Sequence, residues 1–224
     1  MDNILNLTRL NDEWAGCRKC TRLVAWREQV AQQKRRAYRD IPYWSKPVPG
    51  FGDPQASVLA VGLAPGAHGS NRTGRMFTGD ASGDFLYSAL FRAGFCNQPH
   101  ARHVHDGLLM RDLFISAVCR CAPPGNKPTG EEVVNCLPYL VREMEIIRPK
   151  IIVALGQIAH VYLSRILRPG EIPGRFIHAS CLQMKDGRWM VSSYHPSQQN
   201  TQTGRLTAPM FDDIWTKVKG ILDE

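Results

Sequence analysis

The sequence predicts an α/β protein in which helices cover a small parallel sheet. Four short segments are continuously apolar and rich in β-branched residues, as strands buried on both faces are. Segments with helical spacing of apolar residues lie between them, and this alternation is typical of a single α/β domain. The predicted strands are SVLAVG (57–62), LFISAV (113–118), KIIVALG (150–156) and WMVSSY (189–194).

Helices are predicted between and after these strands. Residues 83–93 repeat apolar side chains at helical spacing, with Ser82 as the N-cap and Gly94 as the stop signal. Thr129 and Glu132 are spaced as a capping box, and apolar residues recur at helical spacing behind them. Two further helical patterns cover residues 157–167 and 209–222.

Length and composition fit one soluble globular domain. The chain has 224 residues, of which 43% are hydrophobic and 21% are charged, and this is enough to form a real core. The sequence has no apolar run near the roughly 18 residues of a membrane span, and its N-terminus lacks a signal-peptide pattern. We expect a single domain over residues 1–224, cytoplasmic and monomeric, with the proline-containing stretch 38–56 as an ordered surface segment.

The chain is basic. Its formal charge of +8 and its pI near 9.3 point to a polyanionic partner such as nucleic acid. Residues 27–46 hold six Lys/Arg against two acids, with Tyr38, Tyr43 and Trp44 interleaved. A solvated helix face followed by a packed aromatic turn would give the same pattern, so charge alone does not identify nucleic acid.

Four segments at the ends of the predicted strands are expected to form the functional site, because ligands of open parallel sheets bind beyond the carboxyl ends of the strands. They are residues 62–80, 119–130, the turn near 156, and 194–205. The first, GLAPGAHGSNRTGRMFTGD, matches neither the P-loop pattern nor the GxGxxG dinucleotide fingerprint. Its glycines indicate that the backbone approaches a ligand closely.

Four cysteines are spaced as metal ligands. Cys17 and Cys20 form a CxxC pair, and Cys121 and Cys136 form a second pair with fourteen residues between them. Four thiolates hold either zinc or an iron–sulfur cluster, and spacing alone does not separate the two. A thioredoxin-like redox role is disfavoured, because the residues before Cys17 look helical whereas that motif follows a strand.

Two of the remaining three cysteines are predicted to be structural. Cys96 and Cys181 are expected to be buried small hydrophobes. Cys119 competes with Cys121 for the third ligand position, but it belongs to the strand pattern whereas Cys121 begins the following loop.

Six segments match one family in order and over almost the whole chain. They are CRKCTRLVAWRE (17–28), PVPGFGDP (47–54), GLAPGAHGSNRTGRMFTGDASG (62–83), VCRCAPPGNKPT (118–129), VALGQIA (153–159) and SYHPSQQNTQTGRLT (193–207). Through them the chain resembles the uracil-DNA glycosylase superfamily, and within it the iron–sulfur branch of broad specificity called family 5.

The resemblance implies a fold, a cofactor and a reaction. The fold is a three-layer α/β/α sandwich around a four-stranded parallel sheet, and the cofactor is one 4Fe–4S cluster on Cys17, Cys20, Cys121 and Cys136. The implied enzyme is a monofunctional DNA glycosylase that flips out uracil and other deaminated bases, including hypoxanthine and xanthine, and hydrolyses the N-glycosidic bond. Its partner would be damaged DNA, double-stranded or single-stranded, and the reaction would initiate base excision repair.

Two positions depart from the best-known members of the superfamily. Ala64 stands where they carry a water-activating Asp, and Ala117 lies near the position of their uracil-pairing Asn. Family 5 shares both losses, and a pocket without a strict reader of the base edge is expected to accept several damaged bases.

The resemblance assigns the chemistry to two residues. His195 would donate a hydrogen bond to the base oxygen, where negative charge develops as the base leaves. Asp80 would orient water or offset the positive charge of the sugar; it is also a natural N-cap for the helix that follows, and both roles are compatible. Phe77 would stack on the expelled base, although a buried core phenylalanine would be favoured without the family context.

The remaining predicted contacts follow from the same loops, and residues 197–205 are expected to insert into DNA and fill the gap left by the base. The base-binding residues are predicted to be Gly62, Ala64, Pro65, Gly66, Phe77, Asn126 and His195. The DNA-binding residues are predicted to be His68, Ser70, Arg72, Arg75, Lys127, Ser197, Gln199, Asn200 and Arg205, together with the backbone amides of residues 66–69.

Two other functions compete with a glycosylase. A non-catalytic nucleic-acid-binding module with a four-cysteine zinc site explains the charge and the cysteines, but not the combination of Phe77, Asp80 and His195. An enzyme acting on small nucleotides or phosphates would use the 62–80 loop and would process free nucleosides instead of DNA.

Overall fold

The computed structural model describes residues 2–224, and within them it contains eight α-helices and a six-stranded sheet. Four strands lie where the apolar runs predict them and run parallel to one another. They are β2 (Val58–Gly62), β3 (Leu113–Ala117), β4 (Ile151–Leu155) and β6 (Trp189–Ser193). Every residue of β2, β3 and β4 is buried, which explains why these strands read as continuous apolar runs.

The sheet has two antiparallel edge strands that the sequence analysis missed. β1 (Phe51–Gly52) pairs with β3, and β5 (Cys181–Gln183) pairs with β6, which gives the order β1-β3-β2-β4-β6-β5. The expectation of a purely parallel four-stranded sheet is therefore wrong at both edges. Strands of two or three residues are too short for periodicity to detect, and short edges limit pairing with other chains.

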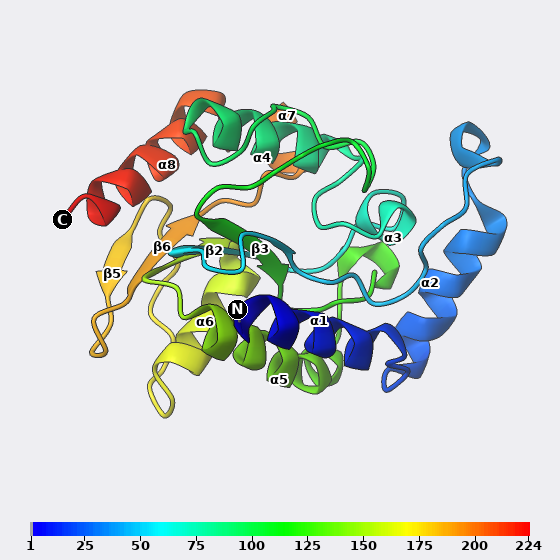
Figure 1. Ribbon diagram of the computed structural model, residues 1–224, viewed down its shortest axis with the longest axis horizontal. Coiled ribbons are helices and arrows are strands. Elements are labelled where there is room, and N and C mark those ends of the chain that lie inside the picture. The colour runs from blue at the N-terminus through cyan, green and yellow to red at the C-terminus, as the bar shows by residue number, and fades with distance from the viewer. Residues whose placement is uncertain (1) are drawn as a thin grey trace.

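Helices cover both faces of the sheet, so the three-layer prediction is confirmed (Figure 1). One face packs against α4 (Ala81–Arg92) and α8 (Ala208–Leu222). The other packs against α1 (Asp2–Ala15), α5 (Gly130–Ile147) and α6 (Gln157–Leu167). Helix α2 (Thr21–Gln33) lies at one side of these layers (Figure 1).

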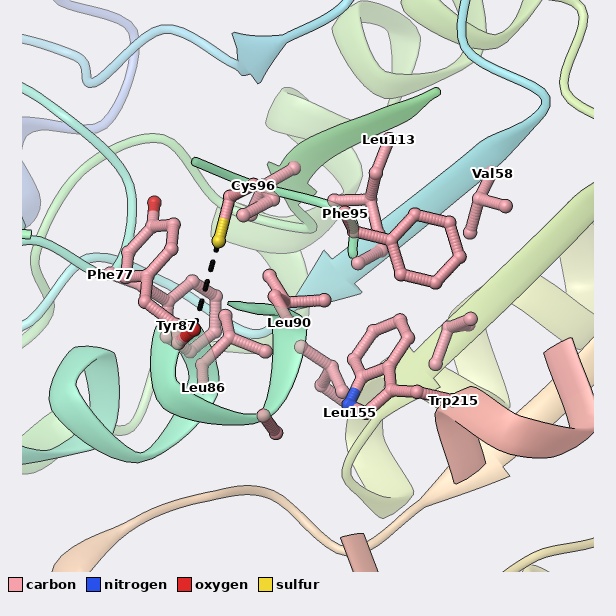
Figure 2. Close-up of a cluster of buried hydrophobic side chains, with 14 of the residues drawn as sticks. Val58, Phe77, Leu86, Tyr87, Leu90, Phe95, Cys96, Leu113, Leu155 and Trp215 are labelled. Atoms are coloured by element: carbon pink, nitrogen blue, oxygen red, sulfur yellow. Dashed lines mark hydrogen bonds between the residues drawn. The ribbon is translucent and has the colours of Figure 1, made fainter. Parts of the chain in front are cut away.

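The larger core cluster lies between the sheet and the α4–α8 layer. Figure 2 shows Val58 and Leu113 of the sheet with Leu90 of α4 and Trp215 of α8 in this cluster. Phe95 meets Trp215 edge-on, with ring centroids 5.9 Å apart. Full burial of each such large apolar side chain contributes about 1.5–3 kcal/mol, so this layer holds the strands that carry the functional loops.

Helix caps follow the sequence signals with one exception. Thr129 Oγ1 accepts from Glu132 N at 3.2 Å and Thr129 N donates to Glu132 Oε2 at 2.7 Å, which confirms the capping box. Gly94 adopts a φ of +78° just beyond α4, as a stop residue should. The N-cap of α4 is Asp80, which accepts from the Gly83 amide, so the Ser82 assignment is wrong. Ser82 lies inside the first turn.

The stretch 38–56 is ordered, as expected, and it also packs on the 62–80 loop. The amides of Trp44 and Ser45 donate to the carbonyls of Arg72 and Asn71, each at 3.0 Å. Backbone hydrogen bonds thus join the basic segment to the loop, while the Trp44 side chain is exposed. Among the described helices, none combines the length and apolar character needed to cross a membrane.

Candidate active site and cysteine centre

The loop after β2 delivers Phe77 in a strained conformation. Phe77 has a φ of +51°, in the left-handed region that large side chains rarely adopt. A Cβ at Gly62 would lie 2.9 Å from Phe77 Cζ, and one at Gly83 would lie 1.7 Å from the Phe77 carbonyl oxygen. Only glycine leaves room at both positions, because Gly62 lies against the Phe77 ring and Gly83 against the Phe77 backbone.

Phe77 and His195, the two side chains on which the predicted site depends, are neighbours. Their rings stack with centroids 5.7 Å apart and planes inclined by 30°. Phe77 is 8% exposed and also belongs to the buried cluster between the sheet and α4 (Figure 2). Phe77 therefore packs in the core and also contacts the imidazole of His195.

His195 is the second residue after β6 and is half-buried. Desolvation lowers the pKa of His195 to about 4, so the imidazole is neutral at pH 7 and retains one N–H for donation. The side chain of Asn200 donates to the His195 carbonyl oxygen at 2.8 Å. A Cβ at Gly156 would lie 3.2 Å from His195 Cβ, so the turn after β4 also borders this histidine.

Asp80 lies at the far end of the same loop and caps α4. Its Oδ1 accepts from the Gly83 amide at 3.0 Å, which confirms the capping role. Its other oxygen lies against the glycine-rich backbone, because a Cβ at Gly69 would lie 1.8 Å from Asp80 Oδ2 and one at Gly66 would lie 2.9 Å from it. Burial raises the pKa of Asp80 above its ordinary value.

The glycine-rich loop is held by side chains of its own and of the basic segment. Arg72 donates from Nε to the His68 carbonyl at 2.7 Å and from Nη2 to the Gly79 carbonyl at 2.9 Å. Its guanidinium lies 4.1 Å from the centre of the Tyr38 ring. Tyr43 Oη and His68 Nδ1 form a hydrogen bond of 3.0 Å, and burial lowers the pKa of His68. These contacts give the loop one defined shape.

Two predicted phosphate contacts are wrong. Arg75 is 4% exposed, and its Nη2 lies 2.6 Å from Asp106 Oδ2 in a buried ion pair. Ser70 is 2% exposed at the start of the short helix α3 (Ser70–Thr73). A phosphate at the surface reaches neither side chain, and Arg75 instead joins the loop to the segment around Asp106. Sequence spacing does not reveal this because the pair joins distant segments.

The first-loop residues predicted to touch the base lie at or beside the end of β2. Gly62 pairs in register with Ala117 at the ends of β2 and β3. Pro65 is buried, and Ala64 packs partly buried against the second core cluster. Asn126 and Lys127 lie on an exposed turn, where Arg22 Nη2 donates to the Lys127 carbonyl at 3.1 Å.

The segment after His195 is more regular than the sequence suggests. It forms a short helix, α7 (Gln198–Gln202), with Ser197 as the N-cap. Gln199 is exposed, whereas Asn200 turns its amide inward to His195. The guanidinium of Arg205 lies 4.8 Å from the centre of the Tyr194 ring. The sequence did not predict the contact between Asn200 and His195, and DNA binding by Asn200 stays a prediction.

The four predicted cysteine ligands line one cavity between the α1–α2 turn and the start of α5. Its wall consists of Trp14, Cys17, Lys19, Cys20, Leu23, Val24, Pro47, Arg120, Cys121, Glu132, Asn135, Cys136 and Tyr139. Cys20 is the N-cap of α2, so a helix precedes the CxxC pair and another begins at it. The chain thus brings together two pairs of cysteines about one hundred positions apart.

Hydrogen-bond donors converge on the sulfurs of this cavity. Arg27 Nη1 donates to Cys121 Sγ at 2.8 Å, the Arg120 amide to Cys136 Sγ at 3.3 Å, and Asn135 Nδ2 to Cys20 Sγ at 3.7 Å. Such donors stabilise thiolates that bind metal.

The chemistry of this donor set fits an iron–sulfur cluster. Four cysteine side chains line one cavity, and three of their sulfurs accept hydrogen bonds from Arg27, Arg120 and Asn135. Within residues 2–224, no group of three or more His, Cys, Asp or Glu side chains is arranged to hold a single metal ion.

The other three cysteines have different environments. Cys119 is fully buried, and the contact of its thiol with Cys136 lowers the pKa of Cys136. Cys96 is 3% exposed, which confirms that prediction. Cys181 is exposed on the edge strand β5, so the expectation that it is a buried hydrophobe is wrong.

Comparison with known proteins points to one family. The model of the Uracil DNA glycosylase superfamily matches residues 49–219. The chain is 50% identical to the Type-5 uracil-DNA glycosylase of Mycobacterium leprae over 219 residues, which cover 96% of this chain and 95% of that protein. It is also 50% identical to the Type-5 uracil-DNA glycosylase of Thermus thermophilus over 206 residues, or 91% and 92% of the two chains. A Type-4 uracil-DNA glycosylase of Pyrobaculum aerophilum is 35% identical over 164 residues, or 69% and 74%.

Proposed function

Because the chain belongs to the uracil-DNA glycosylase superfamily, we propose that it is a monofunctional glycosylase that removes uracil from DNA. The reaction is hydrolysis of the N-glycosidic bond, and it initiates base excision repair. We include hypoxanthine and xanthine among its substrates. The observation that carries the proposal is the stack of Phe77 on His195, in a site to which the same loop contributes Asp80.

The target base must leave the DNA stack before it can react. Extrusion costs a few kcal/mol and is easiest for a mispaired base, so deaminated bases are selected partly by their weak pairing. Phe77 offers the expelled base an aromatic surface beside the imidazole, and Gly62 and Pro65 bring backbone close to it. Ala64 and Ala117 offer the base edge no polar side chain, which supports a broad range of bases.

His195 stabilises the leaving base. The base departs with negative charge on its oxygen, and an N–H aimed at that oxygen is worth about 2.7–4 kcal/mol in the transition state. The imidazole of His195 is neutral at pH 7, because desolvation lowers its pKa to about 4. It therefore acts as a hydrogen-bond donor without first having to lose or gain a proton, and Asn200 fixes the backbone from which it projects.

Asp80 acts on the sugar side of the bond. The sugar gains positive charge as the base leaves, and a fixed carboxylate stabilises that charge or orients the attacking water. The Gly83 amide holds one oxygen of Asp80 in place, while the second oxygen lies beside Gly66 and Gly69. The cap and the catalytic role therefore use different oxygens of one carboxylate.

DNA binding uses the surface around these loops. Helix α7 begins three residues after His195, so Ser197, Gln199 and Arg205 are suited to fill the space that the flipped nucleotide leaves. Lys127, His68, Arg72 and the backbone amides of residues 66–69 are our proposed phosphate contacts. The net charge of +8 supports attraction to the DNA backbone.

We assign Cys17, Cys20, Cys121 and Cys136 as ligands of one 4Fe–4S cluster. When bound, the cluster supplies a cross-link and no chemistry to the hydrolysis, which transfers no electrons. The cysteines themselves join the α1–α2 turn to the segment that carries Asn126 and Lys127. Loss of that cross-link is expected to weaken DNA binding before it alters the pocket.

The proposal is tested with labelled duplexes that differ in one base. Wild type and His195→Ala are incubated with duplexes containing uracil, hypoxanthine, xanthine or no damage, and abasic sites are cleaved and resolved on a gel. We expect excision of the damaged bases only, and strong loss in the variant. Activity confined to free nucleosides would favour the small-nucleotide enzyme, and a colourless zinc protein without excision would favour the binding module.

A further inference from the structure

Arg27 is a buried cation at the cysteine cavity. It lies on α2 and is 2% exposed. A buried guanidinium is costly unless a negative group compensates its charge. The ion pairs among the described side chains do not include Arg27, and its Nε has no hydrogen-bond partner there. Its remaining donors therefore indicate where the compensating charge lies.

Those donors face the cysteine-bearing segments. Arg27 Nη1 lies 2.8 Å from Cys121 Sγ, and Nη2 lies 3.2 Å from the Cys17 carbonyl oxygen. One guanidinium thus joins the two segments that supply the ligands. The carbonyl of Arg27 in turn accepts from Asn71 Nδ2 at 3.4 Å, so the same residue also touches the glycine-rich loop.

The other arginines around the cavity have carboxylate partners. Arg120 is paired with Glu143, Arg22 with Glu132 at 2.6 Å, and Arg18 with Glu28 at 2.5 Å. Arg27 differs from all three because a cysteine sulfur, and not a carboxylate, accepts from its guanidinium. A cluster held by four thiolates carries net negative charge and would supply the missing counter-charge.

We propose that Arg27 is a positioning residue for the iron–sulfur cluster. Arg27 helps to retain the cluster by neutralising part of the cluster's negative charge and by donating a hydrogen bond to the Cys121 sulfur. This inference rests on the cluster assigned under the proposed function. Hydrogen bonds to ligand sulfurs raise the reduction potential of a cluster and slow its loss. Replacement of Arg27 is therefore expected to change cluster retention and potential, independently of any effect on excision.

The test compares four holoproteins purified without oxygen: wild type, Arg27→Gln, Arg27→Lys and the control Arg18→Gln. Arg18 lies between Cys17 and Cys20 but pairs outward with Glu28, so its replacement removes the same charge without touching a sulfur. Iron and acid-labile sulfide per chain, the decay of visible absorbance in air, and the reduction potential are measured. We expect R27Q to lose its cluster roughly tenfold faster than wild type. The reduction potential of the cluster in R27Q should be more negative. R27K should be intermediate, and R18Q should match wild type.

The outcomes separate this inference from the proposed function. If the purified wild-type protein contains no iron and no acid-labile sulfide, the cluster assignment is refuted. A wild-type cluster with unchanged decay and potential in R27Q would overturn the role of Arg27 and leave the glycosylase proposal intact. If circular dichroism shows that R27Q does not fold, R27K is compared with wild type instead. Lysine keeps the positive charge but lacks the planar, forked guanidinium of arginine. Wild-type decay and potential in R27K would then overturn the inference.

Discussion

The ring of Phe77 stacks on the imidazole of His195, with centroids 5.7 Å apart. Phe77 comes from the loop after β2, and His195 follows β6. Strand β4 lies between those two strands in the sheet, so the stack spans the carboxyl edge over three parallel strands. The contact makes each residue part of the environment of the other, and it defines the site on which the following predictions are built.

Replacement of His195 should separate hydrogen-bond donation from packing. His195→Ala removes the donor, and we expect single-turnover excision of uracil to fall by about 10²–10³-fold. His195→Gln keeps an N–H donor on a side chain of similar reach and should lose less. Rapid-quench kinetics on a uracil duplex measures both, and a loss below threefold in H195A would show that His195 is not the donor.

Replacement of Asp80 should separate charge from helix capping. Asn is as good an N-cap as Asp. Burial disfavours the charged form of the Asp80 carboxyl and raises its pKa, so a neutral amide fits the same place. Asp80→Asn should therefore keep α4 and the unfolding free energy. Excision should nevertheless fall by about 10²–10⁴-fold, the usual range for a lost acid–base group. Asp80→Ala should also lose about 1 kcal/mol of stability with the cap. Full excision activity in D80N would leave Asp80 with the capping role alone.

The glycine at position 69 should be required by the carboxylate of Asp80. A Cβ there would lie 1.8 Å from Asp80 Oδ2, so Gly69→Ala must displace the carboxylate or the loop. We expect a loss of about 1–3 kcal/mol in urea unfolding, together with a fall in excision. Gly220→Ala is the control, because open space surrounds that helical glycine; it should gain up to about 1 kcal/mol and keep wild-type excision. Equal behaviour of the two variants would contradict the close approach.

The buried pair of Arg120 and Glu143 should be structurally essential. Glu143 is 0% exposed, pairs with Arg120, and accepts from Ser116 Oγ at 2.6 Å. Glu143→Ala leaves a buried guanidinium uncompensated, and we expect a loss of about 3–5 kcal/mol in denaturant unfolding. The exposed pair of Glu13 and Arg142 supplies the control, since Glu13→Ala should change stability by less than about 1 kcal/mol.

Stability should fall in mild acid because of His195. Desolvation lowers its pKa from 6.5 to about 4, so between these values the unfolded chain binds a proton that the folded chain does not. Unfolding free energy therefore falls as pH drops from about 6.5 to about 4, by about 2–3 kcal/mol for this group. Denaturant unfolding of wild type and His195→Gln across this range measures the difference. Parallel pH profiles would show that His195 titrates normally in the folded protein.

Local patterns in the sequence predicted the features that depend on near neighbours. The apolar runs located β2, β3, β4 and β6, because each of these strands is buried on both faces. The Thr129–Glu132 spacing located the start of α5, because a capping box needs only four residues. The Ser82 assignment failed where two capping residues lie close together, and the helix begins at the one whose carboxylate reaches the Gly83 amide.

Two other errors have different causes. Arg75 carries a polar side chain that the sequence assigned to DNA, yet it pairs with Asp106, 31 residues away. Composition gives no sign that a distant segment already satisfies such a group. Cys181 was misplaced because the short edge strand that exposes it has no periodicity of its own.

The sequence by itself determined the fold class, the family and the two pairs of cysteines, because these follow from hydrophobic periodicity and from motifs that are contiguous in the chain. Only the tertiary structure decided which side chains meet. It placed Phe77 against His195, Asp80 Oδ2 against Gly69, and Arg27 against Cys121. Such contacts depend on how distant segments pack, and packing fixes positions to within an ångström, which no residue spacing encodes.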